Sequence, residues 1–193
     1  MLLPIIGIIA VVAIYLVTTY NGLVKLKTQI EASIQEIGNQ LKRQASLIPN
    51  LESTVKGYLK HEKGIFELLA SARKSATQAQ QSGDIADIDE AITKINSMIP
   101  KIQVVIEDNP EIKADATINK FMSELTDTAD KLSYARRSLI DLTQSYNQKL
   151  VVFPSNIVAN IFGFKKEKGL STPTTGAHVE VSAEETKDVK VDL

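Results

Sequence analysis

The sequence predicts an all-α protein in which an N-terminal transmembrane helix continues into a long antiparallel four-helix bundle. Three observations lead to this prediction. Residues 1–24 carry no charged side chain. Apolar residues then recur at alternating spacings of three and four over four long segments, as they do in coiled coils. The connections between these segments are short, which makes neighbouring helices antiparallel in an up-down-up-down order.

Composition limits the class of protein. The 193 residues are 44% hydrophobic and 23% charged, which is enough for one modest domain with a real core. The 22 Lys and Arg residues are balanced by 23 Asp and Glu residues, so the excess of positive charge typical of nucleic-acid-binding proteins is missing. Because the chain has no Cys, it has neither a thiol nucleophile nor a Cys-ligated zinc site.

We expect residues 1–20 to form a transmembrane anchor. About 20 apolar residues cross a hydrocarbon core of roughly 30 Å, and Leu2 to Tyr20 is long enough to do so. A cleaved signal peptide is the alternative, but its basic start and small-residue cleavage site are missing before Tyr20. Lys25 and Lys27 follow the apolar segment. The positive-inside rule therefore predicts a single-pass protein of the cytoplasmic membrane with its body in the cytoplasm.

Residues 21–153 are predicted to form the antiparallel helical bundle. The first helix leaves the membrane, and we expect it to end before Pro49, because a residue that precedes proline is biased away from helical geometry. The second helix then begins at Pro49 or Asn50 and carries an apolar stripe interrupted by Glu62. The sequence QQSGD at 80–84 indicates a turn, with Asp84 or Ser82 as the cap of the next helix.

The third and fourth helices differ in length. Seven isoleucines between Ile85 and Ile106 follow a strict 3-4 spacing, so we expect Pro100 to kink this helix without ending it. Residues 107–115 form the next turn, and a longer stripe runs from Ile118 to Phe153. At 1.5 Å per residue these helices span roughly 35 and 55 Å. We therefore expect part of the fourth-helix stripe to stay exposed and available to a partner helix.

Residues 154–168 are predicted to form an amphipathic, basic, membrane-proximal segment. The bundle topology returns Phe153 to the bilayer surface, and apolar side chains followed by lysines are typical of a segment that lies among lipid headgroups. The alternative is a segment that packs back on the bundle. Residues 169–193 are predicted to be a disordered tail. The candidate interface residues are Ile157, Val158, Ile161, Phe162, Phe164, Lys165 and Lys166.

Catalytic and metal-binding motifs are weak in this sequence. His61 is followed by Glu62, but the second histidine of the zinc-protease motif HExxH is missing. We interpret Glu62 as a buried polar residue that pairs with an arginine. The candidate partners are Arg73, Arg136 and Arg137. We predict no catalytic, cofactor or metal site, no small-molecule substrate and no nucleic-acid partner.

Several segments, taken together, resemble the LemA family of bacterial single-pass membrane proteins. The resemblance extends from about Tyr20 to Phe164, and its most specific parts are LIPNL, VKGY, HE, YARR, YN and FPSN. It implies an N-terminal transmembrane helix, a long helical bundle and work at or on membranes, and it brings no enzymatic activity. The family pattern usually has Arg where Gln44 stands and Asp where Ser46 stands, so no functional site is carried over.

The leading hypothesis is a non-enzymatic membrane-anchored scaffold that organises or recruits protein partners and self-associates. Its expected contact surfaces are the fourth-helix stripe, the turns near Pro49 and Pro110, and the segment from Ile157 to Phe164, with membrane lipid as a further partner. The alternative is a signalling or sensor subunit whose bundle relays a state across the membrane. A third hypothesis, an enzyme that uses His61 and Glu62 as acid and base, has the least support.

Overall fold

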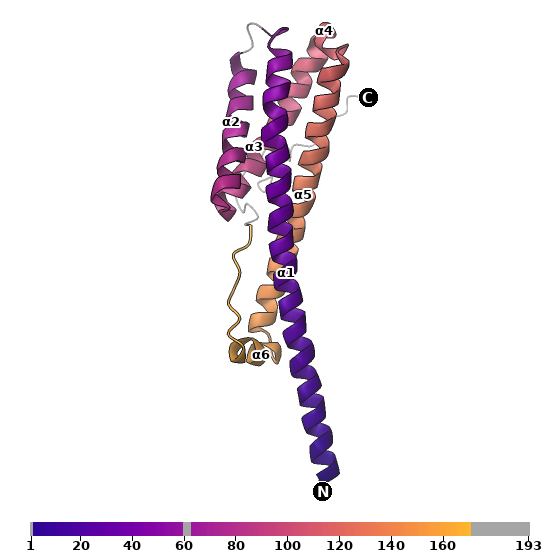
Figure 1. Cartoon of the computed structure of the whole chain (residues 1–193), viewed down its shortest axis with the longest axis vertical. Coiled ribbons are helices and arrows are strands. Elements are labelled where there is room, and N and C mark those ends of the chain that lie inside the picture. The colour runs from indigo at the N-terminus through magenta and orange to yellow at the C-terminus, as the bar shows by residue number, and fades with distance from the viewer. Residues whose placement is uncertain (1, 60–62, 171–193) are drawn as a thin grey trace, which may run out of the picture.

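The computed structural model describes residues 2–59 and 63–170, and every regular element in these ranges is helical. Figure 1 shows the long first helix and the shorter helices gathered around its second half. The predicted all-α class is therefore confirmed. The helices are α1 (Leu2–Val55), α2 (Lys63–Ser82), α3 (Ile85–Asp108), α4 (Pro110–Lys113), α5 (Ala116–Val151) and α6 (Ser155–Ile161).

Helix α1 joins the apolar N-terminal segment to the body without a break. Its N-terminal part protrudes alone from the rest of the chain (Figure 1). This part has the length and apolar composition of a membrane span, and none of its most apolar stretch is buried against the protein. Leu3, for example, is 86% exposed. A helix that is apolar all round and has no protein cover fits a lipid environment.

The body consists of the second half of α1 with α2, α3 and α5. Helix α1 packs against α5 and α2, α2 packs against α3, and α3 packs against α5 (Figure 1). Leucines and isoleucines from all four helices fill the space between them, and Leu41, Leu69, Ile92 and Leu132 are fully buried. We call the end of the body that holds α4 the distal end, and the end that holds α6 the base.

The predicted helix end at Pro49 is wrong. Helix α1 continues through Pro49 to Val55, and the chain turns after it. An internal proline removes one helical hydrogen bond and costs about 3 kcal/mol. Ile48, Leu51 and Val55 are buried beside it, and burial of such side chains contributes about 1.5–3 kcal/mol each. Packing therefore outweighs the local preference for a break.

The start and the interior of α3 agree with the sequence. Asp84 caps the helix, since its carboxylate accepts a 2.8 Å hydrogen bond from the N–H of Ala86. The helix continues through Pro100, as expected, and all its stripe isoleucines except the half-buried Ile85 are buried. The predicted turn at 107–115 contains the short helix α4, which begins with Pro110 at a position where the missing N–H costs nothing.

The expectation of an exposed stripe on the fourth helix is wrong. Along α5 the stripe residues from Ile118 to Tyr146 are buried, except Phe121 and Leu142, which are half-buried. Helix α5 is indeed longer than α3, with 36 residues against 24. Its lower half is covered by α1 and by residues 162–170, which we call the return segment because the chain runs back along the body there (Figure 1).

Candidate membrane interface

Helix α6 closes the base of the body. A shared hydrogen bond fixes the turn between α5 and α6, because the single hydroxyl proton of Ser155 faces the carbonyl oxygens of Lys149 and Val152, which lie 2.7 and 2.9 Å from the hydroxyl oxygen. Val158 and Ala159 are buried on the inner side of α6. Helix α6 contacts both α5 and α1, and it lies beside α1 where the body ends (Figure 1).

Tyr20 fixes the position of α6 along α1. Its ring centroid lies 4.8 Å from that of Phe162 and 5.6 Å from that of Phe164, and both pairs are tilted. Such contacts between aromatic rings stabilise a packing arrangement beyond the burial of area alone. Since Tyr20 ends the apolar stretch of α1, the base of the body lies at the C-terminal end of the candidate membrane span.

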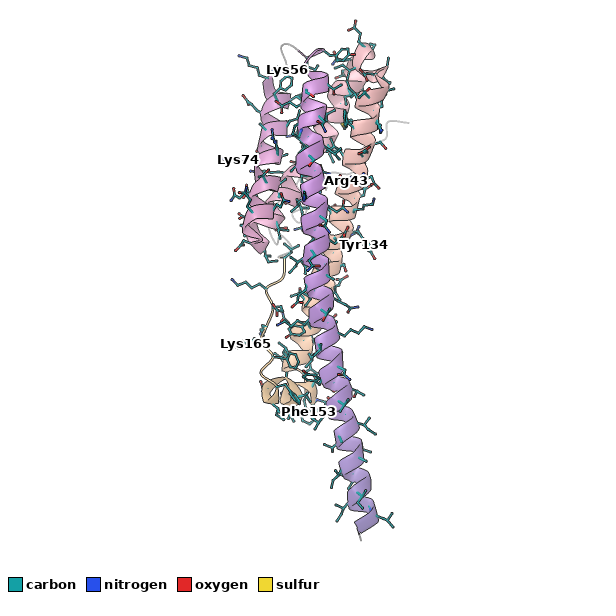
Figure 2. All side chains as sticks on the ribbon, in the orientation of Figure 1. Arg43, Lys56, Lys74, Tyr134, Phe153 and Lys165 are labelled. Atoms are coloured by element: carbon teal, nitrogen blue, oxygen red, sulfur yellow. The ribbon has the colours of Figure 1, made fainter. Side chains whose placement is uncertain are left out.

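Large apolar side chains are exposed around this base. Phe153 is 75% exposed and lies at the lower edge of the body in Figure 2. We call the exposed set the apolar rim, which consists of Val151, Val152, Phe153, Ile157, Ile161 and Phe162. Contiguous exposed apolar side chains are typical of a surface that meets a partner or a membrane.

The structure divides the predicted interface residues into two groups. Ile157, Ile161 and Phe162 are exposed in the rim, as a membrane-facing role requires. The expectation that Val158 faces outward is wrong, since it is 1% exposed and packs on the body. Phe164 is half-buried against Tyr20. These two residues hold α6 in place, and an α-helix of two turns necessarily points part of its apolar side chains inward.

Two rim residues, Val151 and Val152, were not among the predicted interface residues, whereas the predicted topology placed Phe153 at the bilayer surface. The stripe of the fourth helix was expected to continue through Phe153. The stripe ends because α5 ends at Val151, so the last residues point away from the core. Pro154 was expected to end the fourth helix, and α5 ends three residues before it.

The return segment is held against α5 by specific contacts, which supports the alternative that this part of the chain packs back on the body. Asn147 forms two hydrogen bonds with the backbone of Glu167, one to its carbonyl at 2.9 Å and one from its N–H at 3.0 Å. Gly169 lies so close to Thr143 that an added Cβ would be 2.9 Å from the threonine methyl group. Leu170 is buried.

An ion pair joins the return segment to α1. The ammonium of Lys27 lies 3.3 Å from the carboxylate of Glu167, and this hydrogen bond and charge raise the pKa of Lys27. Both side chains are partly exposed, so the pair contributes little free energy. Beneath it, burial raises the pKa of the fully buried Tyr146, whose hydroxyl has no hydrogen-bond partner among the described residues.

Four exposed lysines lie next to the apolar rim. The ammonium of Lys149 reaches α1 at Gly22, where an added Cβ would lie 3.5 Å from it. Lys165 and Lys166 follow directly after Phe164, and Figure 2 shows Lys165 above Phe153. We call the four residues the lysine collar, which consists of Lys25, Lys149, Lys165 and Lys166.

The structure describes the three arginines of the predicted polar pairing. His61 and Glu62 lie outside the described residues. Arg136 of α5 forms an ion pair with Asp89 of α3 at 2.6 Å, and both side chains are mostly buried. Arg73 and Arg137 are exposed on α2 and α5 and do not converge on Arg136's partner. Arg136 therefore joins α5 to α3 through this ion pair.

A buried polar contact sits inside the body. The amide nitrogen of Gln44 on α1 donates to the carbonyl of Leu125 at 2.8 Å and to the hydroxyl of Thr128 at 2.6 Å. Gln44 and Thr128 are fully buried. Such contacts fix the register of two packed helices.

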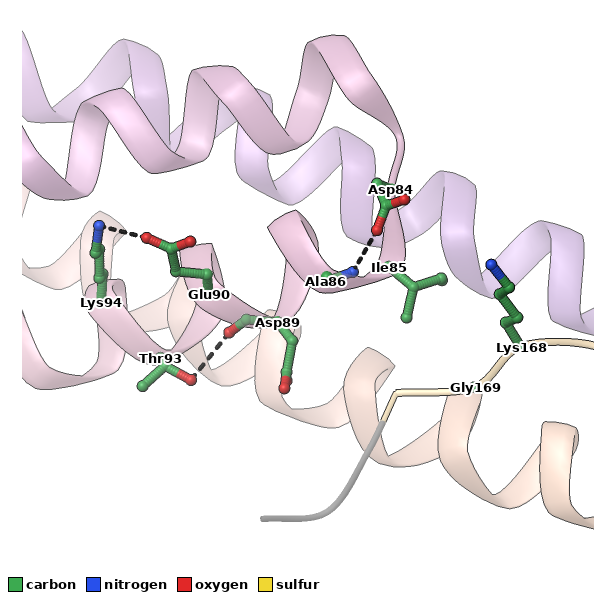
Figure 3. A pocket seen from close by; sticks show the side chains of 9 residues that line it. All are labelled: Asp84, Ile85, Ala86, Asp89, Glu90, Thr93, Lys94, Lys168 and Gly169. Atoms are coloured by element: carbon green, nitrogen blue, oxygen red, sulfur yellow. Dashed lines mark hydrogen bonds and ion pairs between the residues drawn. The ribbon is translucent and has the colours of Figure 1, made fainter.

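A hollow of about 740 Å³ lies between the first turns of α3 and the return segment near Gly169 (Figure 3). Its acidic side chains already have partners. Asp84 caps α3, Glu90 pairs with Lys94 at 2.6 Å, and Asp89 pairs with Arg136. Within the described ranges, no group of three or more His, Asp or Glu side chains could hold a metal ion. The acidic residues around the hollow thus form ion pairs and cap a helix.

Comparison with known proteins agrees with this architecture. The model of the LemA family matches residues 33–183. The magnetosome protein MamQ of Magnetospirillum gryphiswaldense is 20% identical over 78% of this chain and 64% of its own length. The magnetosome proteins MamQ 1 and MamQ 2 of Paramagnetospirillum magneticum are each 21% identical over 86% of this chain and 69% of their own length. The chain thus spans about two thirds of the length of these relatives. Because the family model covers most of the body and all of α6, the chain belongs to the LemA family.

Proposed function

We propose that this protein is a non-enzymatic scaffold of the cytoplasmic membrane, anchored by α1, that organises or recruits protein partners at the bilayer surface. Its relatives include magnetosome proteins, which agrees with a role in assembly at a membrane. The described residues offer helical packing, ion pairs between helices and an exposed apolar base. These features suit a body that positions other molecules.

The observation that carries this proposal is the contact of Tyr20 with Phe162 and Phe164. The 19 residues from Leu2 to Tyr20 span about 28 Å as a helix, close to the thickness of a hydrocarbon core. A helix that docks on Tyr20 therefore lies at headgroup level when α1 spans the membrane. The apolar rim then enters the interface, where it removes apolar area from water.

Membrane depth at the rim tests this arrangement. The chain has no native Cys, so Ile161→Cys carries a single spin label at the rim, and Tyr134→Cys, on the exposed surface of α5, is the matched control. In proteoliposomes we expect oxygen to relax the label at 161 more strongly than a water-soluble nickel complex does, and the reverse at 134. Equal access of the nickel complex to both labels would overturn the proposal.

We further propose that the body lies in the cytoplasm. Residues 2–30 and 142–170 form the lower part of the molecule and carry six lysines against one glutamate, a net charge of +5. Residues 31–59 and 63–141 carry 13 basic and 16 acidic residues, a net charge of −3. Positive charge next to a span favours the cytoplasmic side.

Sidedness is measured with the same single-cysteine protein. We expect an impermeant maleimide to label Tyr134→Cys only after the inner membrane is permeabilised. Labelling in cells whose inner membrane is intact contradicts the cytoplasmic placement and moves the search for partners to the envelope.

The distal end is the part of the body we propose for contacts with protein partners, including a second copy. It lies farthest from the base (Figure 1) and joins the end of α1 to the start of α5. There the hydroxyl of Tyr58 donates to Asp115 at 3.0 Å. With a photo-cross-linking residue at Glu111, we expect a product of twice the chain mass in proteoliposomes. A product of single mass alone contradicts self-association at this end.

A second candidate function is a relay of state across the membrane. The observation in its favour is the continuity of α1 from the apolar segment to the distal end. Insertion of two glycines after Thr18 interrupts this continuity and leaves Tyr20 on the side of the body. A scaffold should keep its cellular phenotype after the insertion, whereas a relay should lose it while the protein remains folded and in the membrane.

A further inference from the structure

We propose that the lysine collar binds the phosphate groups of anionic phospholipids, so that the base of the protein selects negatively charged lipid. This inference rests on the proposed docking of the apolar rim. It identifies anionic phospholipids as the ligands that bind next to that surface. The collar brings together residues from α1, from the end of α5 and from the return segment, which are far apart in the sequence.

The collar lies in a layer directly above the rim. Lys25 is five residues beyond Tyr20, which places its Cα about 7 Å farther from the membrane span along α1. Lys149 reaches α1 near Gly22, within one helical turn of Lys25. Lys165 is next in sequence to Phe164, whose ring contacts Tyr20. A membrane that accepts the rim therefore brings its headgroups to these ammonium groups.

The collar lysines differ from the lysines of the body in their surroundings. In the body, Lys94 pairs with Glu90 and Lys131 pairs with Asp127. Glu167 is the acidic residue of the lower part, and its carboxylate pairs with Lys27. The four collar lysines take part in none of the ion pairs between described residues, and all four are exposed.

Charge complementarity identifies the occupant. An exposed layer of positive charge that continues into an apolar rim matches a bilayer, in which phosphates overlie acyl chains. A lysine near an anionic membrane surface strengthens binding by about fivefold, and this attraction weakens as salt screens it. A zwitterionic surface carries no net charge to attract the collar. Selectivity for anionic lipid is therefore the property that separates this proposal from apolar docking alone.

The test uses the full-length chain with one reporter. The chain has no Trp, so Phe153→Trp places a single tryptophan in the rim. The protein is reconstituted in vesicles that mix phosphatidylcholine and phosphatidylglycerol, with bromine on the acyl chains of one lipid or the other. Bromine quenches tryptophan on contact, so the two quenching curves give the relative binding of the two lipids at the base.

We expect phosphatidylglycerol to bind about fivefold or more tightly than phosphatidylcholine, and high salt to reduce this ratio. The combined variant Lys25→Gln, Lys149→Gln, Lys165→Gln and Lys166→Gln should bring the ratio to about one. The matched control, Lys56→Gln with Lys74→Gln, removes exposed lysines of the distal end and α2 (Figure 2) and should leave the ratio unchanged.

The outcomes separate this inference from the proposed function. Equal quenching by both lipids in the parent protein overturns the selectivity and leaves rim docking intact. A preference for phosphatidylglycerol that survives in the quadruple variant overturns the assignment to these lysines. Quenching by neither lipid overturns both proposals, because the rim is then outside the bilayer.

Discussion

Asp115 connects three parts of the distal end. Its carboxylate accepts hydrogen bonds from the N–H groups of Thr117 and Ile118 at the start of α5 and from the hydroxyl of Tyr58 after α1. The bond from Ile118 is the largest of the causes that lower the pKa of Asp115 below its ordinary value of 3.8. The same carboxylate raises the pKa of Tyr58. The ionised carboxyl group is therefore the form that the folded protein stabilises.

This pKa shift makes the distal end sensitive to acid. As pH falls, the unfolded chain takes up the proton at Asp115 before the folded chain does, so protonation favours unfolding. The stabilisation is complete above the ordinary pKa and is lost as pH falls through the lowered value. Asn keeps the capping oxygen but cannot ionise. In thermal melts followed by circular dichroism, Asp115→Asn should melt below the parent at pH 7, and the gap should close below pH 3.8. A gap that stays constant with pH contradicts this account.

Pro49 shows how an element can override the preference of one residue. Helix α1 continues through it because Ile48, Leu51 and Val55 are buried on the same helix. Pro49→Ala restores the missing N–H and should stabilise the protein by about 1–3 kcal/mol in urea unfolding. Pro110→Ala is the control, since Pro110 begins α4 and its N–H has no helical partner. If the two variants gain equal stability, the packing argument for α1 fails.

The return segment is an element held by close packing. Gly169→Ala places a methyl group 2.9 Å from the methyl group of Thr143 and should destabilise the segment by about 1–3 kcal/mol. Faster tryptic cleavage after Lys165 and Lys166 is the expected readout. Adding Thr143→Ala removes the facing methyl group and should recover part of the protection.

Gly64→Ala is the matched control for this prediction, because a Cβ at Gly64 meets nothing within 4 Å. Its cleavage rate in the return segment should equal that of the parent. An unchanged rate in Gly169→Ala would show that the segment is not held at this glycine.

Periodicity in the sequence predicted the helices well because each stripe reflects burial against a neighbour. The isoleucines of α3 and the Asp84 cap are examples of local signals that the structure keeps. Local signals fail where a distant segment decides the outcome. The exposed stripe expected on α5 is covered because Asn147 and Thr143 bind the return segment, and neither residue carries a sequence signal for a partner 20 or more residues away.

The candidate interface was predicted only in part, because it too depends on contacts between distant segments. Apolar residues followed by lysines were visible in one short segment, which identified Ile157, Ile161, Phe162, Lys165 and Lys166. Sequence alone could not tell that Val158 faces inward, since this depends on which side of α6 meets α5. It also could not group Lys149 with Lys165, because the contact of Lys149 with α1 is made only in the folded chain.

At the scale of the whole molecule, the helices form a column with a chemically distinct base. The 36 residues of α5 span about 54 Å, from the distal end to the apolar rim. The base combines exposed apolar side chains with net positive charge, whereas the rest of the body is slightly acidic. We propose that this division lets one end of the column meet a membrane while the other end meets partners in water.

Energy transfer to the bilayer surface tests this arrangement most directly. A donor dye is attached to Lys56→Cys at the distal end or to Phe153→Cys at the base, the two positions labelled at opposite ends of the body in Figure 2, and an acceptor is carried on lipid headgroups. An upright column predicts strong transfer from residue 153 and weak transfer from residue 56, which lies about 50 Å from the base along the helices. Equal transfer from the two positions would show that the body lies flat or stands away from the bilayer, and would contradict the account.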